Sequence, residues 1–328
     1  MMPTATTLSS RRRLSAEAYA KVNLRLEVHG RRTDGYHEIV SLMHPIDLAD
    51  TVTVTLSAEP VQSERTSPPA ARGRIVVDCP AQPDLNGPKN LAGLAAAAWL
   101  EAWDRVDPTR HRDTVVHTEI AKRIPVAAGL GGGSADAAAV LGLLQAIDPL
   151  PETTMAQLAA VLGADVPYFR LDRPAVARGK GERLTPIRSL LQLPLLLGMP
   201  AFGISSADAY RWWDERVDEP APGLDCLAPF EAGAVLNPTS VIQPGFVHND
   251  LTRPVIGRYP VIGELIEAIR HAGALGAEMT GSGSAVYGLF TDDAEQAARA
   301  AALLAGKYPC IKWRICRLSA RTDCGEDT

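Results

Sequence analysis

One stretch of the sequence decides how this chain folds: Pro125-Val126-Ala127-Ala128-Gly129-Leu130-Gly131-Gly132-Gly133-Ser134-Ala135. The β-branched run 114–124 before it is typical of a strand, and the alanine-rich run 134–147 is typical of a helix. Glycines let the backbone approach an anion, and the free N–H groups of a helix N-terminus attract it. Ser134 is a good N-cap. The stretch predicts a phosphate-binding loop, although a glycine-rich turn that only allows tight helix packing has the same composition.

The glycine-rich stretch fits neither standard nucleotide-binding motif. The pattern G-x-x-x-x-G-K-[ST] is absent, and a G-x-G-x-x-G pattern begun at Gly129 meets Ser134 where glycine is required. A second glycine-rich turn, 279–285, lies between a helix-like run and a strand-like run. Taken alone, this second turn fits a plain hairpin or loop equally well.

The order of the predicted elements indicates an α+β protein. The 328 residues, 46% of them hydrophobic, are enough for two domains. Strands and helices alternate without a strict βαβ order, which argues against a doubly wound sheet. Strands are predicted at 16–28, 51–56, 74–78, 114–124, 195–199, 285–290 and 311–318, and helices at 90–103, 134–147, 154–162, 206–215, 260–272 and 293–306. We expect a disordered tail at 1–14, two domains at 15–185 and 186–320, and a C-terminal tail at 321–328.

Charge and composition exclude several classes of function. Lys and Arg total 33 against 38 for Asp and Glu, so the net charge of -5 gives no general attraction to nucleic acid or to an anionic membrane. The longest apolar run, 190–204, is interrupted by prolines and is too short to span a bilayer. No apolar segment follows the arginines at 11–13, as a secretory signal requires. We expect a cytoplasmic protein with small-molecule substrates and with no nucleic-acid, membrane or protein partner.

The five cysteines predict neither a disulfide framework nor a zinc site. Their number is odd and no two of them form a C-x-x-C pair. We therefore expect reduced thiols.

Three motifs, taken in order, resemble the GHMP kinases, the family of galactokinase and of homoserine, mevalonate and phosphomevalonate kinases. They are Ala20-Lys21-Val22-Asn23-Leu24, the stretch 125–135, and Thr280-Gly281-Ser282-Gly283-Ser284-Ala285. The resemblance extends from about residue 15 to residue 318. It implies an ATP-binding N-terminal domain, a C-terminal α/β sandwich domain, and an active site in the cleft between them. It also implies that 125–135 binds ATP, with Gly281, Ser282 and Gly283 as the third motif.

Two further segments resemble the branch of this family that acts on a diphosphocytidyl substrate. They are Asp34-Gly-Tyr-His37 and Leu162-Gly-Ala-Asp-Val-Pro167. The resemblance implies transfer of the ATP γ-phosphoryl group to the 2-hydroxyl of a methylerythritol moiety, in the non-mevalonate route to isoprenoids. Asp165 is the implied base and Lys21 the cation beside it, which keeps the carboxylate ionised and stabilises developing charge. Without the resemblance, Asp165 fits a turn residue and Lys21 a solvated strand residue.

The same resemblance implies a binding site for the acceptor. Asn23 follows Lys21 on the same face of a strand. The ring of Tyr36 would stack on cytosine while His37 supplies hydrogen bonds, and Tyr210 would form the second face of the stack. Asn249 fits a residue that lines the cleft and a helix cap equally well. The implied substrate-binding residues are Asn23, Tyr36, His37, Ser206, Tyr210 and Asn249.

ATP is the implied phosphoryl donor, and Mg²⁺ is expected with it because the ion bridges phosphate oxygens and offsets their charge. Only Ser134 matches a ligand position known in some GHMP kinases, so the metal ligands are not assigned. Two alternatives remain open. The chain is another GHMP kinase, acting on mevalonate, phosphomevalonate or homoserine, or it is a nucleotide sensor without catalysis. The sensor is disfavoured because it needs neither Lys21 nor Asp165.

Overall fold

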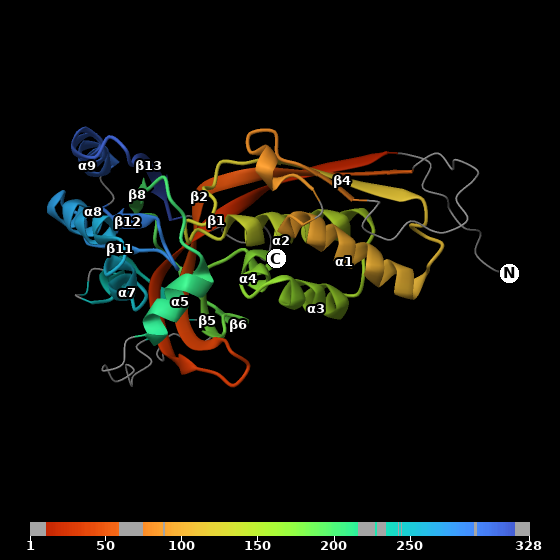
Figure 1. The fold of residues 1–328 in the computed structure, drawn as a ribbon, viewed down its shortest axis with the longest axis horizontal. Helices are drawn as coiled ribbons and strands as arrows, with labels where there is room; N and C mark the ends of the chain where they lie inside the picture. Colours follow the sequence, from red (N-terminus) through yellow and green to blue (C-terminus); the bar gives the residue numbers. More distant parts are fainter. Residues whose placement is uncertain are drawn as a thin grey trace, which may run out of the picture. The chain divides into compact units, whose positions relative to one another are not determined.

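The computed structural model describes residues 11–58, 75–87, 89–215, 227, 234–241, 243, 245–291 and 294–318. These residues form two compact units, each assembled from segments that are separated in the sequence. Unit 1 comprises Met1–Ala18, Ala49–Arg123 and Gly132–Arg170, and unit 2 comprises Tyr19–Leu48, Ile124–Gly131 and Leu171–Thr328. Two long strands, β1 (Arg12–Arg31) and β2 (His37–Ala58), contribute residues to both units (Figure 1).

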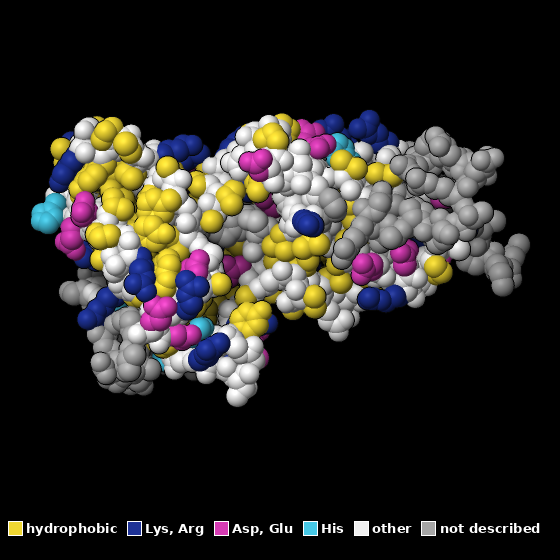
Figure 2. Space-filling view, viewed as in Figure 1, with side chains coloured by type: hydrophobic (Ala, Val, Ile, Leu, Met, Phe, Trp, Pro, Cys, Tyr) yellow, Lys and Arg dark blue, Asp and Glu magenta, His cyan; other side chains and the backbone are white. Residues whose placement is uncertain are grey.

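Charged side chains of both signs are mixed on the surface. On the face shown in Figure 2, basic and acidic side chains lie among hydrophobic ones near α5 (Ser206–Asp214). Ion pairs such as Arg211 with Asp208 and Arg258 with Glu215 form there. None of the helices in the described ranges is both long enough and apolar enough to span a membrane.

Unit 1 contains a sheet with helices packed against it. The last part of β2 pairs antiparallel with β4 (Thr114–Ala121), and β4 pairs in parallel with β3 (Ile75–Asp78). Buried and more exposed residues alternate along β4, as expected for a strand with one face toward a core. The helices of this unit are a 3-10 turn η2 (Pro83–Leu85), α1 (Leu91–Val106), α2 (Gly132–Ile147), α3 (Glu152–Leu162) and α4 (Val166–Leu171).

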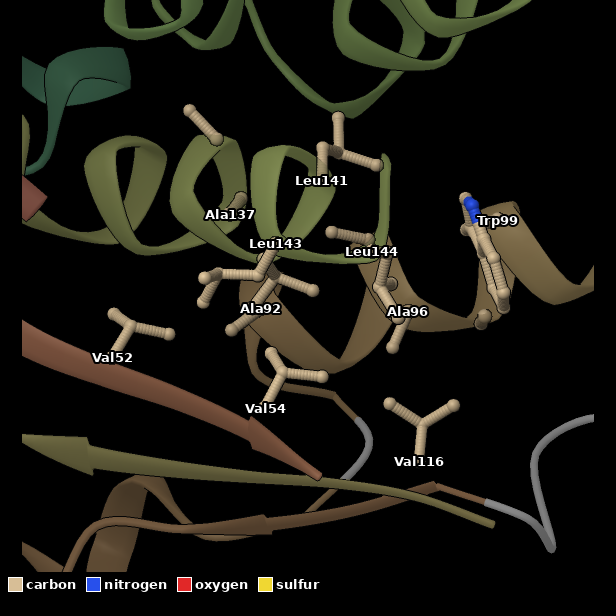
Figure 3. Packing of buried hydrophobic residues seen from close by; sticks show 14 of the residues in the cluster. Val52, Val54, Ala92, Ala96, Trp99, Val116, Ala137, Leu141, Leu143 and Leu144 are labelled. Atoms are coloured by element: carbon tan, nitrogen blue, oxygen red, sulfur yellow. The ribbon is translucent and has the colours of Figure 1, made fainter. Parts of the chain in front are cut away.

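The core of unit 1 lies between the sheet and the helices α1 and α2 (Figure 3). Helix α1 begins where the Asn90 side chain accepts a hydrogen bond from the backbone N–H of Ala92, at 3.0 Å. Alanines on both helices let them pack closely, and Trp99 is fully buried against them. Figure 3 labels Val52, Val54, Ala92, Ala96, Trp99, Val116, Ala137, Leu141, Leu143 and Leu144 from this core.

Unit 2 contains a four-stranded antiparallel sheet with helices α8 (Pro260–His271) and α9 (Ala294–Lys307) against it. The strand order is β11 (Gly276–Met279), β12 (Val286–Leu289), β8 (Pro194–Met199), β13 (Lys312–Arg317). Every residue of β8 is buried, which explains why this strand reads as a continuous apolar run instead of an alternating one.

The remaining elements of unit 2 surround its share of β1 and β2. Strand β10 (His248–Asn249) pairs in parallel with β1, and β5 (Ala175–Gly179) pairs antiparallel with both β2 and β6 (Arg183–Pro186). The other elements are β7 (Arg188–Ser189), β9 (Val235–Leu236), α5, α6 (Pro238–Val241) and α7 (Thr252–Ile256).

The α+β class predicted from the sequence is confirmed, and each predicted strand or helix overlaps an observed element. The division of the chain differs from the contiguous domains predicted at 15–185 and 186–320. Residues Ile39–Met43 of β2 pair with β5 in unit 2, whereas Thr51–Ala58 pair with β4 in unit 1. Because β1 and β2 each contribute residues to both units, no boundary between contiguous segments separates the units.

Strand β1 begins earlier than predicted, at Arg12, whose side chain donates a hydrogen bond to the backbone oxygen of Ile147 at 2.9 Å. The disordered tail predicted at 1–14 is therefore wrong for residues 12–14, which belong to β1. Residues 1–10 of that tail, the predicted tail at 321–328 and most of the predicted loop 57–72 lie outside the described residues. Among the described cysteines, Cys79, Cys310 and Cys316 are free thiols.

A buried histidine in β2 makes the stability of the fold depend on pH. His44 donates from Nδ1 to the oxygen of Pro45 and accepts from the Ser189 hydroxyl at Nε2, at 2.8 and 2.9 Å. Complete burial lowers the pKa of His44 from 6.5 to about 4. The unfolded chain therefore binds a proton near pH 6.5 that the folded chain accepts only near pH 4.

We predict that the free energy of unfolding decreases as the pH falls from 6.5 to about 4, by roughly 3 kcal/mol from His44 alone. Denaturant unfolding over this pH range measures the slope. His44→Gln should flatten it, and the exposed His271→Gln should not. An equal slope in wild type and His44→Gln would contradict the prediction.

Candidate active site

A buried lysine on β1 forms the centre of the candidate site. Lys21 is 4% exposed, and its Nζ donates hydrogen bonds to Asn23 Oδ1 at 2.6 Å and to the Gly129 carbonyl at 2.8 Å. Its backbone N–H also donates to the Leu130 carbonyl, at 3.1 Å. An ammonium group is buried at high cost unless its protons find acceptors. Lys21 therefore holds the glycine-rich loop against β1, which a solvated strand residue would not do.

Asn23 extends this network to the third glycine motif. Its Nδ2 donates to the Ser41 hydroxyl at 2.7 Å, and its backbone N–H donates to the Thr280 hydroxyl at 3.1 Å. The Tyr287 hydroxyl donates to the Asn23 carbonyl at 2.9 Å. Asn23 and Lys21 lie on the same face of the strand, as predicted from their spacing.

The two glycine-rich turns pack backbone against backbone inside unit 2. A Cβ atom at Gly129 would lie 2.0 Å from the Thr280 carbonyl oxygen, and the φ of Gly129 is +75°. A Cβ at Gly281, with φ +55°, would lie 2.9 Å from the Gly129 carbonyl and 3.1 Å from Lys21 Nζ. Only glycine fits at these two positions. The structure thus brings all three predicted motifs together.

The glycine-rich loop passes directly into helix α2, which begins at Gly132. Gly131 adopts a φ of +74° and turns the chain into the helix. Ser134 lies in the first turn of α2 and is not its N-cap, because the helix begins two residues before it. Apart from its chain neighbours and the backbone of its own helix, no atom of the described residues lies within 4 Å of a Cβ placed at Gly133. The first N–H groups of α2 have no partner within the helix, as at any helix start.

Asp165 lies in the turn between α3 and α4, at intermediate exposure. Its backbone oxygen accepts a hydrogen bond from Phe169 at 3.2 Å, which starts α4. Within unit 1, no described residue forms a hydrogen bond or an ion pair with its carboxylate. Asp165 belongs to unit 1 and Lys21 to unit 2, so their pairing stays a prediction.

The structure also contains a buried charge cluster in unit 1 that the sequence analysis did not predict. Lys122 Nζ donates to Asp50 Oδ2 and to Asp136 Oδ2, and all three side chains are almost inaccessible to solvent. Burial, together with the nearby Asp50, raises the pKa of Asp136 to about 7 against the lowering effect of Lys122. The cluster connects the N-terminal part of α2, through Asp136, to Asp50 of β2 and to Lys122, the residue that follows β4. The sequence did contain one signal for this cluster, because Lys122 directly follows a strand-like run and stands just before the glycine-rich loop.

The predicted cytosine-binding residues are only partly brought together. His37 is 8% exposed and stacks on Tyr210, with 4.7 Å between ring centroids and an interplanar angle of 18°. Tyr36 is 53% exposed, and Lys180 Nζ lies 4.5 Å from its ring centroid. The Ser206 hydroxyl lies 3.2 Å from that of Ser282 in the third motif. Tyr210 therefore contacts His37, and a base sandwiched between Tyr36 and Tyr210 stays a prediction.

Asn249 has a scaffolding position. Its Nδ2 donates to the carbonyls of Met279 and Gly281, both at 2.8 Å, and its Oδ1 accepts from Leu251 at the start of α7. These contacts use the polar atoms of a side chain that is almost fully buried. They favour the capping interpretation over direct contact with a substrate.

Comparison with known proteins identifies the family. Residues 91–173 match the model for the GHMP kinases N terminal domain, and residues 245–307 match the model for the GHMP kinases C terminal. The 4-diphosphocytidyl-2-C-methyl-D-erythritol kinase of Anaeromyxobacter dehalogenans (strain 2CP-C) is 40% identical over 300 residues, 89% of this chain and 84% of that protein. The chain belongs to the 4-diphosphocytidyl-2-C-methyl-D-erythritol kinase family. The kinase of the same name from Citrifermentans bemidjiense is 37% identical over 293 residues, which are 89% of this chain and 94% of that protein.

Solved structures agree with this family. A crystal structure of 4-(cytidine 5'-diphospho)-2C-methyl-D-erythritol kinase is 35% identical, with a TM-score of 0.67 over 94% of this chain and all of that one. A homoserine kinase from Cytophaga hutchinsonii has a TM-score of 0.62 at 14% identity, covers 96% of each chain, and shows only that the fold is shared. The GHMP resemblance predicted from the three motifs is confirmed.

We predict that Gly129→Ala destabilises the protein by about 2 kcal/mol or more, because its Cβ meets the Thr280 backbone and its φ is strained. Gly133→Ala is the matched control, since it adds the same methyl group in open space on a helix. Thermal and denaturant unfolding of both variants measures the difference. Equal stability of the two variants would refute the backbone packing described above.

Proposed function

We propose that this chain transfers the γ-phosphoryl group of ATP to the 2-hydroxyl of 4-diphosphocytidyl-2-C-methyl-D-erythritol. The products are the 2-phosphate and ADP, in the non-mevalonate route to isoprenoid precursors. The observation that carries the proposal is the meeting of three kinase motifs around the buried Lys21. The printed names of relatives at 37–40% identity support the acceptor.

The ATP phosphates would bind where the loop 125–131 enters α2. The N–H groups of the first helical turn and the helix dipole favour negative charge there. The open space at Gly133 lets phosphate oxygens approach the backbone. On this proposal, Gly133→Ala folds normally and binds ATP more weakly.

Asp165 would accept the proton of the acceptor hydroxyl, because an alcohol is a weak nucleophile unless a base assists it. Lys21 would stabilise negative charge on the transferring group. Mg²⁺ would enter with ATP and offset its charge. Within the described ranges, no cluster of three or more His, Cys, Asp or Glu side chains fits a metal ion, so we assign no protein ligands to it.

The deciding experiment measures ADP release from ATP and Mg²⁺ with four separate acceptors: the diphosphocytidyl compound, mevalonate, phosphomevalonate and homoserine. Turnover with the cytidyl compound alone supports the proposal. Turnover with another acceptor would support a kinase of this fold that acts on a different substrate. In that case, replacing Tyr36 and His37 with alanine would leave the activity intact. ATP binding without turnover on any acceptor would favour the sensor.

We predict that Asp165→Asn lowers kcat by about 10²- to 10⁴-fold and leaves ATP affinity nearly unchanged, because the carboxylate acts on the acceptor and not on the nucleotide. Steady-state kinetics and ATP titration measure the two effects. Glu152→Gln, on the exposed face of α3, is the control and should retain full activity. Normal turnover by Asp165→Asn would exclude Asp165 as the base.

A further inference from the structure

Three residues on one face of α5 hold the ring of His37. Tyr210 stacks on the ring, and Trp213 packs edge-on, with 5.7 Å between centroids. Asp214 Oδ1 lies 2.7 Å from Nε2 of the ring. The three positions are i, i+3 and i+4 of a helix, so their side chains lie next to one another. The ring is therefore fixed by packing and by one hydrogen bond together.

The partner of Nε2 determines where the proton of a neutral His37 lies. An ionised carboxylate only accepts hydrogen bonds, so Nε2 must carry the proton and donate it to Asp214. Nδ1 then has a lone pair and accepts. Within the described part of the chain, Nδ1 has no hydrogen-bond partner, and it is not among the buried polar atoms left unsatisfied. His37 therefore offers one oriented acceptor to a ligand.

A second charged side chain lies beside the Asp214 carboxylate. Arg31 Nη1 lies 4.0 Å from Oδ2 of Asp214, the oxygen that does not face His37. Arg31 is largely exposed, while Asp214 is partly buried. The two carboxylate oxygens of Asp214 thus have different partners: Oδ2 faces Arg31, and Oδ1 faces the His37 ring.

We propose that Asp214 is a positioning residue that sets base specificity, by holding His37 with Nδ1 as a hydrogen-bond acceptor. Cytosine carries an exocyclic amine that donates to such an acceptor, whereas uracil carries a carbonyl at the same position and leaves two acceptors facing each other. The proposal rests on the proposed function and on the expectation, implied by the family resemblance, that His37 supplies hydrogen bonds to the cytosine of the substrate. An unmatched polar pair in a binding site discriminates strongly between otherwise similar ligands.

The test compares kcat/KM for the diphosphocytidyl substrate and its diphosphouridyl analogue. Wild type should prefer the cytidyl compound by about 100-fold or more. Asp214→Leu, which is similar in size but accepts no hydrogen bond, should reduce this ratio to about tenfold or less, mainly through a higher KM for the cytidyl compound. Asp214→Asn keeps a carbonyl acceptor and should retain most of the ratio.

Glu215→Gln is the matched control, because it removes a neighbouring negative charge that pairs with Arg258 and not with His37. Its ratio should equal that of wild type. A wild-type ratio in folded Asp214→Leu would overturn the proposal, and so would an Asp214→Asn ratio as low as that of Asp214→Leu. Altered stability alone changes activity toward both substrates and leaves their ratio unchanged.

A second measurement does not depend on the substrate or on the folding of any variant. ¹⁵N NMR of histidine-labelled wild type, at a pH where His37 is neutral, shows which ring nitrogen carries the proton. We expect the proton on Nε2, and a proton on Nδ1 would overturn the proposal. If wild type shows the Nε2 proton but does not phosphorylate the cytidyl compound, the proposed function fails while the His37–Asp214 contact stands.

Discussion

The buried ammonium group of Lys21 is the interaction on which the candidate site depends. Its protons must find acceptors away from water, and two of them are the Asn23 side chain and the Gly129 carbonyl. One acceptor is its neighbour on β1, and the other lies 108 residues further along the chain. A single charge thereby sets the path of the glycine-rich loop.

Close packing of backbones completes the arrangement around Lys21. Gly129 and Gly281 approach each other so closely that neither position has room for a Cβ atom. Asn249 donates hydrogen bonds to the Met279 and Gly281 carbonyls and so fixes the turn that contains Gly281. The lack of side chains at these two glycines is what permits this contact.

The two buried lysines of this chain show different electrostatics. Lys122 lies between the carboxylates of Asp50 and Asp136, which stabilises its charge inside unit 1. A buried ion cluster of this kind contributes little net stability, but it fixes geometry, here the start of α2. Lys21 donates hydrogen bonds to the Asn23 side-chain oxygen and to the Gly129 carbonyl inside unit 2.

The sequence alone determined the α+β class, the long helices and strands, and the family, because these depend on local periodicity and on ordered motifs. Three further features were decided only by the tertiary structure. They are the division of β1 and β2 between two units, the cluster around Lys122, and the stacking of Tyr210 on His37. Each depends on contacts between residues far apart in the chain, where a side chain's neighbours, and not its own propensity, determine what it does.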